Sequence, residues 1–412
     1  MQEFNISKTT KTHKVQPAIV TVLVVVIIIS IKTDFLTINT HMFLSLTEPF
    51  NEKQQCPNVL GHMMEGVWKQ KAMSLKETND IELFLDDSRK QHGLNVTLQR
   101  NDSKCGNVSF PHKTGSKMQW FRGLCDRKGN TPCCFNNQCV NRSPDQCRCK
   151  DCYDMRQQIH AEYSDFISKD QRCQIKQFNY IEACDLLTNA TLAFVGDSYI
   201  RHIFTAVLLF LRNNYVDGAL SQNVKKDIYD QCTGMYMFTE KVCRNHLDQW
   251  KTSDICGGKV NLLFRYFYSS AFGSQATNFI QNRMYNKSRS LFLFGVGLHD
   301  SFNTTNIKSK LITPIYQLSK KTQWPKLLWA TPHQPGILKN GNIEVQSKAK
   351  VKEFISKMND ILSPLNIPQF NTYDMTNGVM SFDGNHYGIG VNLLKFQVLL
   401  NYIQELKNNG QW

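Results

Sequence analysis

The chain has 412 residues, of which 41% are hydrophobic and 20% charged, and its 48 Lys and Arg against 34 Asp and Glu give a net charge of +14. This composition excludes an intrinsically disordered chain, a collagen and a disulfide-stapled mini-protein, and the length predicts two or three domains of about 100 to 200 residues each. The positive charge is compatible with nucleic acid, an anionic membrane or acidic glycans as partners.

The N-terminal region predicts a membrane anchor. Residues 15–31 form a charge-free, largely aliphatic run of 17 residues, and the preceding segment, residues 1–14, carries Lys8, Lys11 and Lys14. A short span with positive charge before it predicts a cytosolic N-terminus and type II topology. A cleaved signal peptide is the alternative, but no small-x-small cleavage site follows Ile31. Short spans favour the Golgi or endoplasmic reticulum membrane. Cleavage of the segment would instead give a secreted form.

All 14 cysteines follow this segment, between Cys56 and Cys256. In a lumenal compartment an even number of cysteines predicts a disulfide framework. Cys149 and Cys152 have the C-x-x-C spacing of zinc or redox sites, but a zinc site would need a second such pair, so a disulfide is favoured. Export also agrees with the seven N-x-S/T sequons that follow the predicted span, at Asn95, Asn101, Asn107, Asn141, Asn189, Asn286 and Asn303.

The remaining chain divides into three predicted parts. Residues 32–115 are polar and weakly periodic, which predicts a stem or an irregular segment. Residues 116–190 are cysteine-dense, which predicts a stapled cap with one helix near Asp154 to Ile167. From residue 191 to 412, short apolar runs alternate with amphipathic segments, which is typical of a parallel β/α sheet. The predicted strands are 191–195, 260–268, 291–296, 327–330 and 371–374, and the predicted helices are 200–211, 351–362 and 391–406.

Polar side chains cluster where these strands end, and ligands of open α/β sheets bind outside the carboxyl ends of the strands. Ser198 follows the first strand at the start of a helix, and Asp383 and His386 lie in the last loop before the final helix. A serine with a histidine base and an orienting aspartate is the set that activates a serine nucleophile. Each residue also has a structural alternative: a helix N-cap for Ser198, and an Asp-Gly turn with a surface histidine for the other two.

Two blocks carry a family resemblance over residues 191–412. Phe194–Phe204, with Gly196-Asp197-Ser198 followed by Arg201, resembles the G-D-S-x-x-R-x-x-[FY] block of the PC-esterase branch of the GDSL/SGNH hydrolase superfamily. Ser381–Tyr387 resembles its C-terminal D-x-x-H block. That branch includes trichome-birefringence-like polysaccharide O-acetyltransferases, the catalytic domain of sialate O-acetyltransferase and the neurexophilin-and-PC-esterase proteins.

The resemblance implies an SGNH-like three-layer α/β sandwich, preceded by the cap and the anchor, and an acyl-serine mechanism. It implies an oxyanion hole formed by the Ser198 backbone and Gly273. Where the wider superfamily carries G-x-N-D, this chain has Gly297-Leu298-His299-Asp300, so His299 would replace the asparagine donor. Arg201 is predicted either to hold a ligand at the site or to form a salt bridge inside the fold.

We therefore expect a lumenal O-acyl, most simply O-acetyl, transferase or esterase that acts on glycans without a cofactor or a metal ion. Its expected partners are a glycan acceptor, an acyl donor and a transporter or partner that supplies the donor. Residues 1–31 carry only +2 of the net charge, so the excess on the rest suggests attraction to anionic glycans. The alternative is a catalytically inactive glycan-binding or adhesion protein. Nucleic-acid binding is disfavoured because the basic residues are dispersed.

Overall fold

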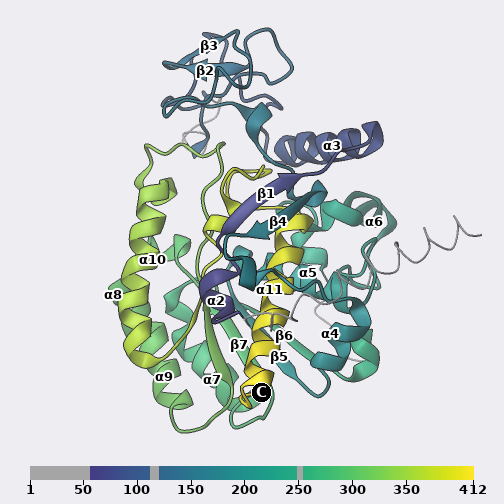
Figure 1. Cartoon of the computed structure of the whole chain (residues 1–412), viewed down its shortest axis with the longest axis vertical. Helices are drawn as coiled ribbons and strands as arrows, with labels where there is room; N and C mark the ends of the chain where they lie inside the picture. The colour runs from purple at the N-terminus through teal and green to yellow at the C-terminus, as the bar shows by residue number, and fades with distance from the viewer. Residues whose placement is uncertain (1–55, 112–119, 248–253) are drawn as a thin grey trace, which may run out of the picture. The chain divides into compact units, whose positions relative to one another are not determined.

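A computed structural model describes residues 56–111, 120–247 and 254–412 (Figure 1). The predicted anchor at residues 15–31 lies outside these ranges. Among the described residues, no helix is both long and apolar enough to cross a bilayer.

The centre of the fold is a five-stranded sheet with all neighbouring strands parallel. The strands lie in the order β6-β5-β7-β8-β9, with β5 at Thr191–Gly196, β6 at Asn261–Tyr266, β7 at Ser290–Gly295, β8 at Lys326–Ala330 and β9 at Gln369–Phe370. The predicted parallel α/β sheet is confirmed. Its central strands β5 and β7 are buried at every position, as expected for parallel strands covered on both faces.

Alternate residues of these strands enter two separate hydrophobic cores. Leu192 and Phe194 of β5 belong to one core, whereas Ala193 and Val195 belong to the other. The first core is completed by α4 (Tyr180–Leu186), α5 (Ser198–Leu211) and α11 (Ile389–Asn408), and the second by α7 (Gly273–Arg283), α9 (Thr313–Ser319) and α10 (Lys348–Leu362). The sheet is therefore enclosed between two helical layers (Figure 1).

The cysteine-rich segment is stapled as predicted, and all 14 cysteines are paired. Four bridges lie within residues 105–152 around the small sheet of β2 (Cys133–Phe135) and β3 (Gln138–Val140). Cys149 and Cys152 pair with each other, so they are not free for zinc. The other bridges are Cys56–Cys173, Cys184–Cys256 and Cys232–Cys243.

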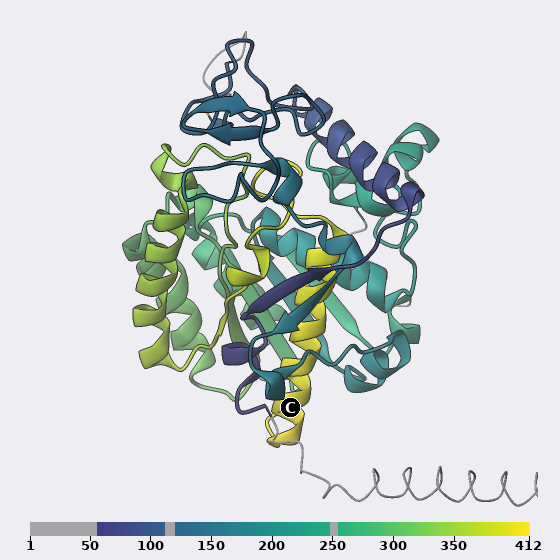
Figure 2. The same ribbon diagram turned by 45° about the horizontal axis from the view of Figure 1, so that its top comes forward.

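The predicted helix near Asp154 to Ile167 is wrong. Met155–Gln157 and Ala161–Tyr163 form single 3-10 turns, and Ser164–Ser168 is strand β4, antiparallel to β1 (Gly66–Gln70). Trp68 of β1 packs in a cluster with Val391, so the strand pair lies against α11, where both views show it (Figures 1 and 2). Pairing across almost one hundred residues leaves no local signal in the sequence.

Two other elements also differ from expectation. The last strand is β9 at Gln369–Phe370 rather than 371–374, because the Asn371 side chain accepts from the backbone N–H of Tyr373 (3.2 Å) and turns the chain. Within residues 32–115, where no regular element was predicted, α2 spans Val59–His62 and α3 spans Leu75–Gln91. A capping box of Ser74 and Glu77 starts α3, and its buried face includes Ile81, Phe84 and Leu85.

Candidate active site

Ser198 is held at the carboxyl end of the sheet, where β5 turns directly into α5. The side chain of Asp197 caps the helix by accepting from the backbone N–H of Tyr199 (3.0 Å). Gly196 permits the close approach of β7, because a Cβ there would lie 2.3 Å from the Gly295 carbonyl oxygen. The helix cap predicted as the structural alternative for Ser198 is thus provided by Asp197, which leaves the Ser198 hydroxyl for other contacts.

The three residues proposed from the sequence come together across 188 residues of chain. His386 Nε2 lies 2.8 Å from Ser198 Oγ, and His386 Nδ1 lies 2.6 Å from Asp383 Oδ2. Both distances are within hydrogen-bond range. The serine, histidine and aspartate therefore form a continuous hydrogen-bonded chain, with the histidine between the other two.

The turn that carries Asp383 and His386 is fixed by its own hydrogen bonds. Asp383 Oδ1 accepts from the backbone N–H groups of Asn385 (2.9 Å) and His386 (2.8 Å). The Ser381 hydroxyl accepts from the Gly384 N–H (2.8 Å) and donates to the His386 carbonyl (2.6 Å). The imidazole consequently meets Ser198 in a defined orientation.

Charge at the site favours a protonated His386. Burial alone would raise the pKa of Asp383, but His386, their hydrogen bond and Lys339 outweigh burial and hold that pKa below its usual value. Burial opposes protonation of His386, yet Asp383 and Glu240 together raise the pKa of its imidazole. The site can therefore stabilise the imidazolium that forms when a base accepts a proton.

Glu240, which was not among the predicted residues, lies on the Ser198 side of the same imidazole. Its Oε1 is 3.7 Å from His386 Nε2 and 2.6 Å from His202 Nε2, and it is paired with the Arg201 guanidinium. Burial lowers the pKa of His202 to about 4, so this ring is neutral and donates from Nε2 to the carboxylate. Arg201 is thus buried in a salt bridge within the fold, the second of its two predicted roles.

His299 lies at the same edge of the sheet. It belongs to the 3-10 turn Leu298–Asp300, and its ring packs edge-on against Tyr268 with centroids 5.2 Å apart. Burial lowers the pKa of His299, the neighbouring Asp300 opposes this, and His386 lowers it further. His299 and His386 are therefore close enough to influence each other's pKa.

Gly273 has a packing role. It opens α7, and a Cβ added to it would lie 1.7 Å from the Lys310 carbonyl oxygen. The atoms nearest to that position belong to Lys310 and Leu311, and the oxyanion-hole role of Gly273 stays a prediction. The backbone N–H of Ser198, in the first turn of α5, has no intrahelical acceptor and belongs to the same residue as the nucleophile.

Two further buried residues support the His386 loop. Lys395 Nζ lies 3.0 Å from His333 Nδ1, and the other nitrogen of that ring contacts the Asn385 carbonyl. Burial lowers the pKa of Lys395 to about 7 and raises that of Asp197 to about 7. These contacts tie α11 to the loop that carries the base.

Three groups at the site have metal-ligating chemistry. The ligand atoms of His202, Glu240 and His386 lie within 4.8 Å of one another. Any ion there would take His386 Nε2, the atom that contacts Ser198, so metal binding and base function would compete.

The predicted glycosylation sites are accessible: all seven sequon asparagines, from Asn95 to Asn303, are exposed.

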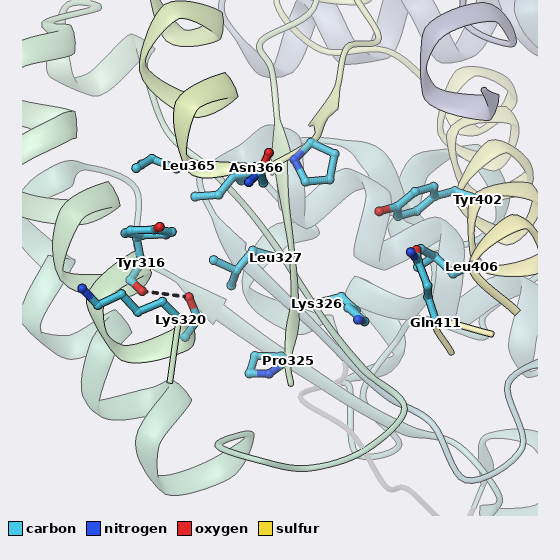
Figure 3. Close-up of a pocket in the computed structure, with 13 residues that line it drawn as sticks. Tyr316, Lys320, Pro325, Lys326, Leu327, Leu365, Asn366, Tyr402, Leu406 and Gln411 are labelled. Atoms are coloured by element: carbon cyan, nitrogen blue, oxygen red, sulfur yellow. Dashed lines mark hydrogen bonds between the residues drawn. The ribbon is translucent and has the colours of Figure 1, made fainter. Parts of the chain in front are cut away.

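The pocket in Figure 3 is not this site. It is a cavity of about 340 Å³ lined by Lys320, Lys326, Leu327, Tyr402 and neighbouring residues. Lys326 is the first residue of β8, so this pocket lies at the amino end of the sheet. Ser198, Asp383 and His386 instead lie at the opposite edge, beyond the carboxyl ends of the strands.

No family model matches the chain, and no curated protein matches it. Among solved structures, a lipolytic protein of the G-D-S-L family from Veillonella parvula aligns at 13% identity over 51% of this chain and 96% of its own, with a TM-score of 0.30. A lipase/acylhydrolase from Enterococcus faecalis aligns at 13% identity over 54% of this chain and 96% of its own, also with a TM-score of 0.30.

Proposed function

We propose that the protein is a serine-dependent O-acyl transferase or esterase that acts on glycans through an acyl-Ser198 intermediate. The observation that carries this proposal is the hydrogen-bonded chain from Ser198 through His386 to Asp383. The same three residues are the ones that the PC-esterase resemblance implies, in the same order along the chain.

In the first half-reaction His386 Nε2 takes the proton of Ser198 Oγ while Oγ forms a bond to the acyl carbon. The carbonyl electron pair moves onto oxygen, and the Ser198 N–H and the positive end of α5 stabilise this oxyanion. His299 is a second candidate donor. When the intermediate collapses, the bond between the acyl carbon and the donor oxygen breaks, and His386 returns its proton to that oxygen.

In the second half-reaction a sugar hydroxyl or water attacks the acyl-Ser198 carbonyl. His386 accepts the proton of the attacking oxygen and passes it back to Ser198 Oγ, which restores the free enzyme. Because both outcomes share the acyl-enzyme, the choice between transfer and hydrolysis depends on which hydroxyl occupies the site.

The location that we propose is the lumen of the Golgi or endoplasmic reticulum. The anchor-like run at residues 15–31, the paired cysteines and the exposed sequon asparagines support an oxidising, glycosylating compartment. The acyl donor, and a transporter or partner that delivers it, would come from outside this chain.

The direct test is labelling of the purified full chain with a fluorophosphonate probe, followed by mapping of the modified peptide by mass spectrometry. We expect the probe on Ser198, no labelling of Ser198→Ala, and full labelling of Ser274→Ala, which removes an exposed hydroxyl from the first turn of α7. If the wild type is not labelled and shows no acyl turnover, but binds glycans on an array equally well with Ser198→Ala, the inactive glycan-binding alternative is favoured instead.

A further inference from the structure

A second cavity lies where the cysteine-rich segment meets the loop after β8. It has a volume of about 440 Å³, and we call it the cap cleft. Arg122, Lys150 and Tyr153 line it from the cysteine-rich segment. Lys339 and Lys348 line it from the other side, with the stretch from Gln334 to Ile337 and residues 376–379.

The lining of the cap cleft carries positive charge and no negative charge, and the nearby carboxylate of Asp383 acts on Lys339 alone among these groups. The cap cleft is lined by Arg122, Lys150, Lys339 and Lys348, and none of the described residues that line it is acidic. Within the described parts of the chain, none of these four groups forms an ion pair with a carboxylate, whereas neighbouring Lys350 pairs with both Glu344 and Glu353. Desolvation lowers the pKa of Lys348, and the nearby Arg122 and Lys352 lower it further. Arg122 and Lys352 are thus each close enough to repel Lys348.

Polar atoms without partners point to the same conclusion. Arg122, Gln334 and Gln346 are 8%, 5% and 4% exposed. Arg122 Nε and the Oε1 atoms of both glutamines are buried and have no hydrogen-bond partner. A buried polar group that stays unpaired costs about 1 to 3 kcal/mol. Arg122 Nε is therefore an unsatisfied donor in the lining of the cavity, whereas the two amide oxygens are unsatisfied acceptors, which a hydroxyl of the bound molecule would satisfy.

Phosphate and sulfate esters match this set of donors. We propose that the cap cleft binds a ligand through tetrahedral oxyanions, as phosphate or sulfate ester groups, with Arg122, Lys339 and Lys348 as the principal contacts. A guanidinium with several N–H donors suits such oxyanions, and two or more negative charges are needed to balance four cations. The cavity is much larger than one oxyanion, so it also accommodates part of the molecule that carries it.

The cap cleft is separate from Ser198 but adjoins the base. The side chain of Lys339 packs against Gly384, since a Cβ there would lie 2.8 Å from Lys339 Cγ, and the Gly336 N–H donates to the Gly384 carbonyl (2.8 Å). Gly384 lies between Asp383 and His386. The proposed ligand therefore binds beside the turn that carries Asp383 and His386, and its binding does not depend on the proposed acyl chemistry.

The test is isothermal titration calorimetry on the purified full chain with two probes, inorganic pyrophosphate and a trisulfated heparin disaccharide. We expect at least one probe to bind, with weaker binding as NaCl rises from about 50 to 500 mM. Lys339→Met and Lys348→Met should each weaken binding about tenfold, because each removes one charged hydrogen bond. Preference for pyrophosphate would identify phosphate esters as the natural group, and preference for the disaccharide would identify sulfate esters.

Lys320→Met is the matched control, because Lys320 lines the pocket of Figure 3 at the opposite end of the sheet. It should leave the affinity unchanged. Lys348 begins α10 on an exposed surface, so Lys348→Met keeps the test valid if Lys339→Met does not fold. The proposal is overturned if neither probe binds at millimolar concentration, or if Lys320→Met weakens binding as much as Lys348→Met does.

Discussion

The contact between Asp383 and His386 determines which ring nitrogen of His386 faces Ser198. With Oδ2 on Nδ1, the Asp383 carboxylate fixes the tautomer that leaves His386 Nε2 free to accept the proton of Ser198. Asp383→Asn preserves the shape of the side chain but loses the charge that stabilises the imidazolium. We expect a fall in kcat of about 10³ to 10⁴-fold.

Hydrolysis of p-nitrophenyl acetate by the purified protein measures this effect. Asp374→Asn is the control, because Asp374 is an exposed residue in the 3-10 turn after β9. Asp374→Asn should match the wild type. An Asp383→Asn enzyme within tenfold of wild-type kcat would contradict a triad role.

Glu240 adds a second negative charge near the base. It raises the pKa of His386, so the wild type needs a higher pH to deprotonate this base. Glu240→Gln removes this contribution and leaves Arg201, whose charge lowers the pKa of His386, without its partner. The pKa of His386 must therefore fall in the variant.

We expect the acidic limb of the kcat/KM profile of Glu240→Gln to move to lower pH. A Glu240 that only braced the fold would lower thermal stability without moving that limb. Glu344→Gln, which removes an exposed carboxylate paired with Lys350, is the control and should leave the profile in place.

At the scale of elements, a short disulfide-closed loop positions Glu240 near His386. The Cys232–Cys243 bridge closes an 11-residue separation, and Glu240 lies inside it. By the loop-entropy relation such a bridge stabilises the fold by about 3 kcal/mol. Replacing both cysteines by serine should therefore lower Tm and also shift the acidic limb in the direction expected for Glu240→Gln, because the carboxylate is no longer held near His386.

The matched control replaces Cys149 and Cys152 by serine. That bridge spans only three residues of the cysteine-rich segment, so it contributes less stability, and it is not part of the loop that carries Glu240. Its removal should leave the pH profile unchanged. Identical profiles for both double variants would show that the Cys232–Cys243 loop does not position Glu240.

How far the sequence predicts these elements depends on whether the signal is local. Strands β5 and β7 and helices α5, α10 and α11 follow from apolar runs and helical periodicity within a few residues. Strand β4 does not, because its stability comes from pairing with β1. Helix α3 has a local signal in the sequence that predicts it, because Ser74 and Glu77 have capping-box spacing ahead of the apolar residues Ile81, Phe84 and Leu85.

The same distinction applies to the site. Ser198, Asp383 and His386 lie at positions that the strand order brings to one edge, so their proximity was predictable. Glu240 does not follow a strand. It lies in a loop closed by a disulfide, and no neighbouring sequence feature predicts that it contacts His386. The role of Arg201 was undecided for the same reason, because its partner was unknown.

At the scale of the whole molecule, the proposed topology separates anchoring from catalysis. If residues 1–31 serve only as anchor and cytosolic tail, replacing them with a cleavable signal peptide should give a secreted protein that still reacts with the fluorophosphonate at Ser198. The full chain should stay in the membrane fraction after carbonate extraction, and glycosidase treatment should increase its mobility on a gel, because all seven sequon asparagines are exposed.

The alternative of a cleaved signal peptide makes the opposite prediction for the full chain. Cleavage near Ile31 would release the native protein into the medium without any replacement, with a new N-terminus that Edman sequencing would detect. Replacing Lys8, Lys11 and Lys14 by glutamate separates the two cases further. An anchor oriented by these lysines would insert in both directions once they are lost, and a fraction of the chain would escape glycosylation, because the positive charges before a short span decide its orientation.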